Sequence, residues 1–322
     1  SSITYPASEA TGVPNAPNVS RVYDGNDQLT SITSGNVVRS LSRDDGDNLV
    51  QENLAIESVT QTVGYAYDTN EALSRITYPS GNQVNYNPDA FGRPRAVQPY
   101  VSQVNYHPNG MPSEVQYANG VVSSMALNNR QWPSSLSFSH SGTSLVSNAY
   151  GYDSVGNLTQ IGDAADPLYA RLYQYDKLDR LVVEGSVDGY REYYYDNTGN
   201  LAYLLTPSAL NTYGYDAASG LLGSVTGGIN RVYQYDSAGN VRTVGNAKFG
   251  HDRANNMRCA FCDAATPTLH TYDGDHMRVQ STDSGVTTQY LHNHQGLLLQ
   301  TLVPGAGRQE HIYLGRRQVA RR

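Results

Sequence analysis

Charged residues are scarce in this sequence, and several kinds of segment are missing from it. Only 16% of the 322 residues are charged, the net charge is -7, and no basic patch runs along the chain. This composition argues against a nucleic-acid partner. No run of about 18 apolar residues occurs, so the sequence predicts no membrane span. The first residues lack a basic stretch followed by an apolar one, and we therefore expect no signal peptide here.

Cysteine is almost absent as well. The two cysteines, Cys259 and Cys262, lie in the stretch RCAFCD. A CxxC pair can be half of a zinc site, a redox pair or a local disulfide. There is no second CxxC, so a metal shell would need His251, His270 or His276 to lie nearby after folding. We favour two small residues in a turn and keep a metal or redox role as the alternative.

Tyrosine is the one abundant aromatic residue, with 26 Tyr against 4 Phe and 1 Trp. Its ring can pack while its hydroxyl meets water or a partner, which suits a half-buried surface. The tyrosines belong to a repeat, and consecutive Tyr-Asp pairs in the centre of the chain lie 20 residues apart. The pairs are Tyr23-Asp24, Tyr67-Asp68, Tyr152-Asp153, Tyr175-Asp176, Tyr195-Asp196, Tyr215-Asp216, Tyr235-Asp236 and Tyr272-Asp273, with degenerate copies at Arg43-Asp44, Tyr86-Asn87, Tyr106-His107, Leu127-Asn128, His251-Asp252 and Leu291-His292.

Each repeat predicts a β-hairpin. The common form is Tyr-x-Tyr-Asp followed by Gly-Asn-Leu, as at Gly199-Asn200-Leu201. Tyrosines at i and i+2 point to one face of a strand. The Asp side chain starts the turn, and Gly supplies the positive φ of a tight reversal. A second turn type, YPSG at 78–81 and YANG at 117–120, marks the other end of the strands. The fold class is therefore all-β, with continuous antiparallel hairpins of about 20 residues each.

Stacked tyrosines also predict how the hairpins hold together. A lone hairpin is marginal in water, so each must pair with its neighbours. The Tyr pairs should form a ladder of cross-strand contacts worth about 0.2–1 kcal/mol each.

This pattern resembles the YD repeat of the RHS family, which includes bacterial Rhs effectors, the B and C components of Tc toxins, and teneurins. The resemblance covers residues 20 to 315 and implies a curved spiral sheet or partial hollow shell. We expect one repeat array over residues 1–322, with an irregular leader or first strand at 1–20, repeats at 21–315 and a basic end at 316–322. Roughly fourteen hairpins would make a ribbon about 130 Å long, too short to enclose a domain alone. We expect a section of a longer array.

In the bacterial branches of that family the shell encloses a toxic C-terminal domain. The resemblance implies a secreted wall segment whose partners are the rest of the shell, an enclosed C-terminal toxin domain and delivery machinery. The alternative is a carbohydrate- or surface-binding module, because Tyr-rich sheets suit glycans. We expect no enzyme, no cofactor and no catalytic or metal-binding residue.

Five other features could carry chemistry, but each has a simpler interpretation. His292 and His294 would share one face of a strand and could bind metal. The acidic run 43–48, with Asp44, Asp45 and Asp47, suggests a calcium loop but lacks the final Glu. We expect polar turn residues in both places. Asp166-Pro167 is the only Asp-Pro, and it lacks the Gly-Leu of the family's self-cleavage motif. Arg316, Arg317, Arg321 and Arg322 fit a strand end better than a docking site. The repeated Asp residues, one per unit, fit turns better than catalysis.

Overall fold

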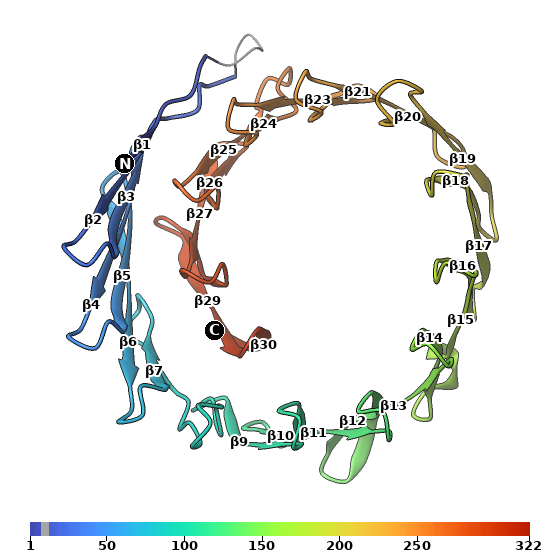
Figure 1. The fold of residues 1–322 in the computed structure, drawn as a ribbon, viewed down its shortest axis with the longest axis horizontal. Coiled ribbons are helices and arrows are strands. Elements are labelled where there is room, and N and C mark those ends of the chain that lie inside the picture. The colour runs from blue at the N-terminus through green and yellow to red at the C-terminus, as the bar shows by residue number, and fades with distance from the viewer. Residues whose placement is uncertain (8–12) are drawn as a thin grey trace. The chain divides into compact units, whose positions relative to one another are not determined.

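The computed structural model describes residues 1–7 and 13–322. These residues form antiparallel β-strands joined mostly by short turns, with a longer connection at 86–100 and the 3-10 turn η1 (Pro167–Tyr169) before β15, so the all-β prediction is confirmed (Figure 1). Within the described residues, no helix has the length and apolar character needed to cross a membrane. The chain divides into two compact units, unit 1 with residues 1–100 and 235–322 and unit 2 with residues 101–234. The expected single array over residues 1–322 remains a prediction.

Unit 1 contains two sheets that come from opposite ends of the sequence. In each sheet, strands that are consecutive in the sequence pair side by side. The N-terminal sheet consists of β1 (Ser2–Ile3), β2 (Val19–Tyr23), β3 (Leu29–Ser34), β4 (Val37–Arg43), β5 (Leu49–Ile56), β6 (Val59–Tyr67), β7 (Leu73–Thr77) and β8 (Gln83–Asn85), and the C-terminal sheet consists of β22 (Val241–Val244), β23 (Ala247–His251), β24 (Met257–Ala260), β25 (Thr268–Tyr272), β26 (Arg278–Asp283), β27 (Val286–His292), β28 (Leu298–Val303), β29 (Gly307–Leu314) and β30 (Arg317–Arg321).

The two sheets of unit 1 form two layers, drawn in blue and in orange to red in Figure 1. We call the face that carries the Tyr-x-Tyr side chains the tyrosine face. The tyrosine face of the N-terminal sheet is buried, for example at Leu54 and Val63, which are both 0% exposed. It packs against the opposite face of the C-terminal sheet, where Leu291 and Ile312 are equally buried. Alternation along the strands thus gives each sheet one face for the core.

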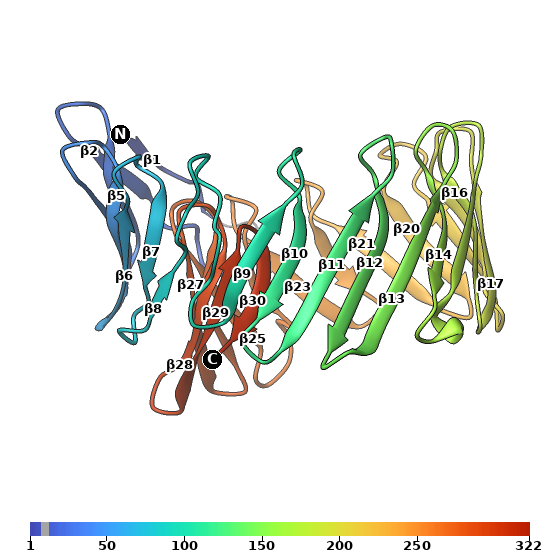
Figure 2. The same ribbon diagram turned by 90° about the horizontal axis from the view of Figure 1, so that it is seen from below.

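Unit 2 is a single layer of strands, and β9 to β14 can be followed side by side in Figure 2. Its buried apolar residues are the four valines Val101, Val104, Val115 and Val225. Most other side chains in this unit are half-buried or exposed. Its strands are β9 (Val101–Tyr106), β10 (Pro112–Tyr117), β11 (Val121–Leu127), β12 (Pro133–His140), β13 (Thr143–Tyr152), β14 (Leu158–Asp163), β15 (Arg171–Tyr175), β16 (Leu181–Ser186), β17 (Gly189–Tyr195), β18 (Leu201–Leu205), β19 (Leu210–Tyr215), β20 (Leu222–Gly227) and β21 (Arg231–Tyr235, whose last residue belongs to unit 1).

Candidate functional site

The Asp of each repeat organises a hairpin turn. At Asp196, Oδ1 accepts hydrogen bonds from the backbone N–H groups of Thr198 and Asn200, both at 2.9 Å. The backbone N–H of Asp196 donates to Asn200 O, and Gly199 closes the reversal at φ 90°. This is a three-residue hairpin loop with a left-handed residue at its end. The same two side-chain bonds recur at Asp24, Asp44, Asp68, Asp89, Asp153, Asp176, Asp236, Asp252 and Asp273.

These bonds favour the ionised carboxylate. The Thr198 hydroxyl, and then the backbone N–H groups of Asn200 and Thr198, lower the pKa of Asp196. At Asp176 the Arg180 side chain is the main cause of the same shift. The prediction that the repeated Asp residues serve turn geometry agrees with these bonds.

In six repeats the second tyrosine bonds to the preceding hairpin. The hydroxyl of Tyr195 donates to Leu181 O at 2.8 Å, and that of Tyr215 donates to Leu201 O at 3.0 Å. The acceptor is the residue that opens the return strand of the previous unit. The same bond joins Tyr67 to Leu49, Tyr152 to Pro133, Tyr175 to Leu158, and Tyr313 to Leu298. Tyrosine therefore links neighbouring hairpins through its hydroxyl, and the expected ladder of stacked tyrosine rings remains a prediction.

Two degenerate copies were assigned to the wrong residues. The expected copy Tyr86-Asn87 does not start a turn, because the turn begins at Asp89, whose N–H donates to Arg93 O. The expected copy Leu291-His292 is displaced by one residue, since Asn293 takes the Asp place and accepts from Leu297 N at 2.8 Å. His292 ends β27 and His294 lies in the turn, so the two do not share a strand face.

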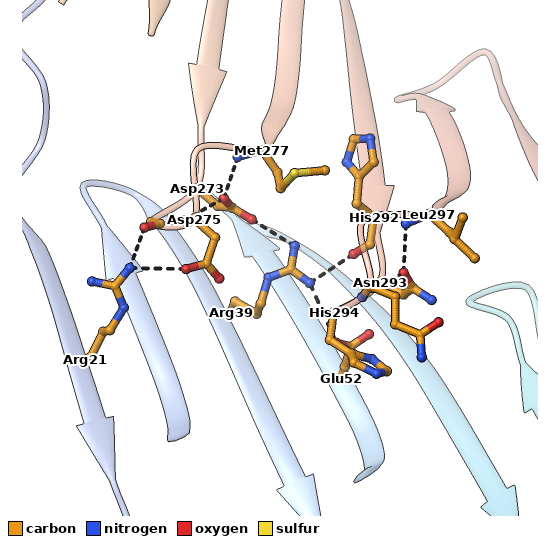
Figure 3. A network of polar contacts seen from close by, with 12 residues as sticks. Arg21, Arg39, Glu52, Asp273, Asp275, Met277, His292, Asn293, His294 and Leu297 are labelled. Carbon is orange, nitrogen blue, oxygen red and sulfur yellow. Dashed lines mark hydrogen bonds and ion pairs between the residues drawn. The ribbon is translucent and has the colours of Figure 1, made fainter. Parts of the chain in front are cut away.

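The most unusual cluster lies between the two layers of unit 1 (Figure 3). The Arg39 guanidinium, on the N-terminal sheet, donates to Asp273 Oδ2 at 2.8 Å and to His292 O at 2.9 Å, both on the C-terminal sheet. It also lies 3.9 Å from Glu52 Oε1. The side chains of Arg39, Asp273 and Glu52 are at most 5% exposed. A buried ion pair of this kind depends on all its partners, because the loss of one leaves a charge without compensation.

Glu52 extends the cluster. Its Oε2 accepts from the Tyr65 hydroxyl at 2.7 Å, and its Oε1 lies 3.4 Å from His294 Nδ1. Burial raises the pKa of Tyr65 above its usual value, and the Glu52 charge adds to the shift. Tyr65 therefore remains a hydrogen-bond donor at neutral pH.

Neutral polar groups continue the contact between the layers. Gln300 Nε2 donates to Gln61 Oε1 at 2.7 Å, and Gln61 Nε2 donates to Gln289 Oε1 at 3.3 Å. The Tyr78 hydroxyl donates to His311 O at 2.9 Å. We call this set of contacts, from Arg39 to His311, the seam. It connects residues more than 200 positions apart in the sequence.

A cavity of about 250 Å³ lies beside the seam in unit 1. The hydroxyls of four lining tyrosines, Tyr65, Tyr67, Tyr78 and Tyr313, already bond to protein acceptors. The lining residues are Tyr65, Tyr67, Leu73, Ile76, Tyr78, Tyr86, Gly92, Pro94, Asn293, His294, Gln295, Leu297, Leu299, Tyr313 and Gly315.

The other candidate residues from the sequence lie in a disulfide, in turns or at the end of a strand. The favoured prediction for the CxxC pair, two small residues in a turn, is wrong: Cys259 lies in β24 and is joined to Cys262 by a disulfide, with Cα atoms 5.5 Å apart. Asp44 accepts from Gly46 and Asn48 in an ordinary repeat turn. In the described part of the chain, no group of three or more His, Cys, Asp or Glu side chains could hold a metal ion. Asp166 caps η1 by accepting from Leu168 N, and Arg317 and Arg321 bound β30.

No family model and no curated protein matches the chain. Solved structures do match it. The crystal structure of TcdB2-TccC3-Cdc42 aligns at a TM-score of 0.73 and 15% identity, over 91% of this chain and 18% of that chain. TcdB2-TccC3 without its hypervariable C-terminal region aligns at a TM-score of 0.68 and 15% identity, over 92% of this chain and 19% of that chain. The Tc holotoxin pore of Photorhabdus luminescens aligns at a TM-score of 0.66 and 14% identity, over 95% of this chain and 20% of that chain.

The chain thus spans about a fifth of the length of the chains it matches. Identity this low speaks for the fold alone. The resemblance to the RHS/YD-repeat family is confirmed at that level: this chain has a fold that also occurs in Tc toxin structures.

Proposed function

We propose that this chain is a wall segment of an RHS-type shell that encloses a toxin or another cargo polypeptide in a secreted bacterial assembly. The observation that carries the proposal is the uninterrupted hairpin array in unit 2, where strand follows strand in one layer. A single layer maximises enclosed area for a given chain length, whereas a compact core would fill the space. The match over 91% of the chain to a Tc toxin structure supports the same use.

The repeated polar residues also favour a wall over an enzyme. The Asp carboxylates are occupied by turn N–H groups, and the second tyrosine hydroxyls by backbone carbonyls. Groups held in this way are not placed to attack or protonate a substrate. We propose no catalytic role for them. The wall's partners would be further repeats and the enclosed polypeptide.

Protease protection tests this function. The chain is expressed with all of its native flanking sequence and digested with proteinase K, and the surviving peptides are identified by mass spectrometry. We expect a flanking segment outside the repeats to survive in the intact protein and to be digested after Arg39→Ala opens the seam. Arg180→Ala, in a partly exposed ion pair of unit 2, is the matched control. Rapid digestion of every flanking segment in the intact protein would contradict enclosure.

A second function, glycan binding, is favoured by one observation. Tyr194 and Tyr203 lie directly opposite each other on β17 and β18, and Tyr190 lies on the same face, with all three between 46% and 61% exposed. Exposed rings of this kind can stack on sugars. Binding on a glycan array that is lost in Tyr194→Ala and kept in Tyr213→Phe would support this alternative. No binding to any glycan would exclude it.

A further inference from the structure

Histidine replaces tyrosine in every repeat of the C-terminal sheet from β23 to β29. In the Tyr-x-Tyr-Asp pattern the second tyrosine position is His251 and His292, and the first is His270 and His311. The alignment is fixed by the turns at Asp252, Asp273 and Asn293, and by the Tyr313 hydroxyl bond to Leu298 O. We call the two tyrosine positions of the Tyr-x-Tyr-Asp pattern the ladder positions, and we call a histidine in one of them a ladder histidine. The other ladder position of these four repeats is Phe249, Tyr272, Tyr290 or Tyr313. Each of these repeats therefore carries one histidine and one other aromatic residue.

This arrangement is confined to unit 1. In unit 2 most of the corresponding pairs are tyrosines, as at Tyr173 and Tyr175 or Tyr193 and Tyr195, and the two exceptions, Val104 with Tyr106 and Met125 with Leu127, contain no histidine. The sequence of unit 2 contains two histidines, His107 and His140. His107 occupies a turn position, and His140 is exposed at the end of β12. Neither takes a ladder position.

The four ladder histidines are poorly placed to accept a proton. The Nδ1 atoms of His270 and His292 are buried and make no hydrogen bond with the described residues. Burial lowers the pKa of His270, and the nearby Arg278 and Arg258 lower it further. Tyrosine in the same position would not ionise in this range of pH.

His292 connects the ladder to the seam. Burial lowers its pKa, and Arg39 adds to the shift, while Asp273 opposes it and Arg278 lowers it again. The backbone carbonyl of His292 accepts a hydrogen bond from the same Arg39. The imidazole itself points away from Arg39 in Figure 3, so a proton on it would act on the seam through the end of β27, whose carbonyl Arg39 binds, and through the charge of Arg39 at longer range.

The remaining two histidines behave alike. Burial lowers the pKa of His251, against the attraction of Asp236 and Asp252. Burial also lowers the pKa of His311, with Gln318 opposing the shift and Arg321 adding to it. His311 Nε2 lies 3.2 Å from Thr301 Oγ1, and its carbonyl accepts the Tyr78 hydroxyl across the seam.

We infer that the C-terminal sheet of unit 1 is a proton-sensitive element, which loosens on mild acidification and releases the seam while the tyrosine-paired sheet of unit 2 stays folded. The sign follows from linkage. A histidine whose pKa is lower in the folded than in the unfolded state contributes stability above about pH 6.5, and that stability is lost as the pH falls below it. This acid response is a property of the chain itself and does not depend on an enclosed cargo.

Hydrogen exchange at about pH 8 and about pH 5.5, with labelling times scaled for the intrinsic rate, tests the inference on the unaltered chain. We expect protection of β25 to β28 to fall at least about tenfold more than that of β15 to β19. Equal protection of the two sheets at both pH values, or a uniform loss in both, would overturn it.

Replacing the ladder histidines by tyrosine, the residue that other repeats have in these positions, tests whether the histidines cause the acid response. His270→Tyr with His292→Tyr should reduce the acid-induced loss at least about threefold, and His140→Tyr should leave it unchanged. If the double variant does not fold at about pH 8, the single variants His251→Tyr and His311→Tyr provide the same comparison in less buried positions. Folded variants with an unaltered acid response would contradict a role for the ladder histidines.

Discussion

Units 1 and 2 use the same repeat but are stabilised differently. Both contain the Asp-centred turn and the tyrosine hydroxyl bond, as Asp68 and Tyr67 show in unit 1 and Asp196 and Tyr195 in unit 2. Only unit 1 adds a second layer, and most of the fully buried apolar side chains lie there. Unit 2 is held by strand pairing and turns, with four buried valines.

This difference between the units shows that the repeat specifies a β-sheet but does not specify a hydrophobic core. Turn residues determine where the chain reverses, and alternation determines the faces. A sheet face is buried only where a second sheet packs on it. In unit 1 that second sheet comes from the other end of the sequence. Arg39 meets Asp273 and the His292 carbonyl only in that arrangement, whereas Glu52 bonds to Tyr65 within its own sheet.

The largest effect is expected from breaking the seam. Arg39→Ala leaves Asp273 and Glu52 buried without their cation and should destabilise unit 1 by about 3–5 kcal/mol. Arg180→Ala removes a partly exposed pair with Asp176 in unit 2 and should cost at most about 1 kcal/mol. Urea unfolding with tryptic peptide mapping measures both. Similar losses in the two variants would mean that the seam does not hold unit 1 together.

The next largest effect is expected from removing an apolar side chain, and it should differ between the two units because only unit 1 has two packed layers. Leu54, 0% exposed between the layers, should lose about 2–5 kcal/mol on replacement by Ala. Leu172, 50% exposed on β15, should change by no more than about 0.5 kcal/mol. Thermal and urea denaturation of the two variants give the comparison. A large loss for Leu172→Ala would reveal a covering layer on unit 2.

A smaller effect should be equal in the two units. Tyr67→Phe and Tyr215→Phe each delete the hydroxyl bond to the preceding hairpin and should each cost about 0.5–1.5 kcal/mol. Replacing Tyr215 and Tyr235 together by Ala removes the rings too and should increase protease cleavage in that region. Tyr190→Phe, at an exposed position, is the control. If neither the Phe nor the Ala variants change melting or proteolysis, the tyrosine ladder does not stabilise the array.

The smallest effect concerns acid. The pKa values of Asp176, Asp196 and Asp216 are lowered in the fold, so their contribution to stability is present above about pH 4 and is lost as the pH falls below it. Unit 2 should therefore keep its amide protection at about pH 5.5 and lose part of it near pH 3. Asp196→Asn should keep the turn, because Asn128 already serves in this place, and should weaken the pH dependence slightly. Loss of protection in unit 2 already at about pH 5.5 would contradict this assignment.

The sequence was sufficient to predict the hairpins, because turn chemistry is local. The positions of Asp153, Asp196 and Asp236 determined the reversals, and the structure agrees at each. Local reasoning was wrong where the repeat is degenerate: Asn87 resembles the expected turn residue, but Asp89 makes the turn.

The seam could not be predicted in the same way. Arg39 shares its strand face with Val37 and Leu41, and Glu52 shares its face with Leu54, so alternation places both charges on an apolar face. Charged side chains are buried there only when they are paired, and the strand sequence does not name the partner. Their partners lie more than 200 residues away for Arg39 and Asp273, and no local signal encodes that distance. The one usable sign was histidine in place of tyrosine from His251 to His311, which marks the C-terminal sheet as different.

Hydrogen exchange of the unaltered chain at neutral pH tests most directly whether layer stacking stabilises unit 1 and strand pairing alone stabilises unit 2. We expect the slowest amides in β4 to β6 and β27 to β29, with distinctly faster exchange across β12 to β20. Equally slow exchange in both units, or the slowest amides in β12 to β20, would contradict it.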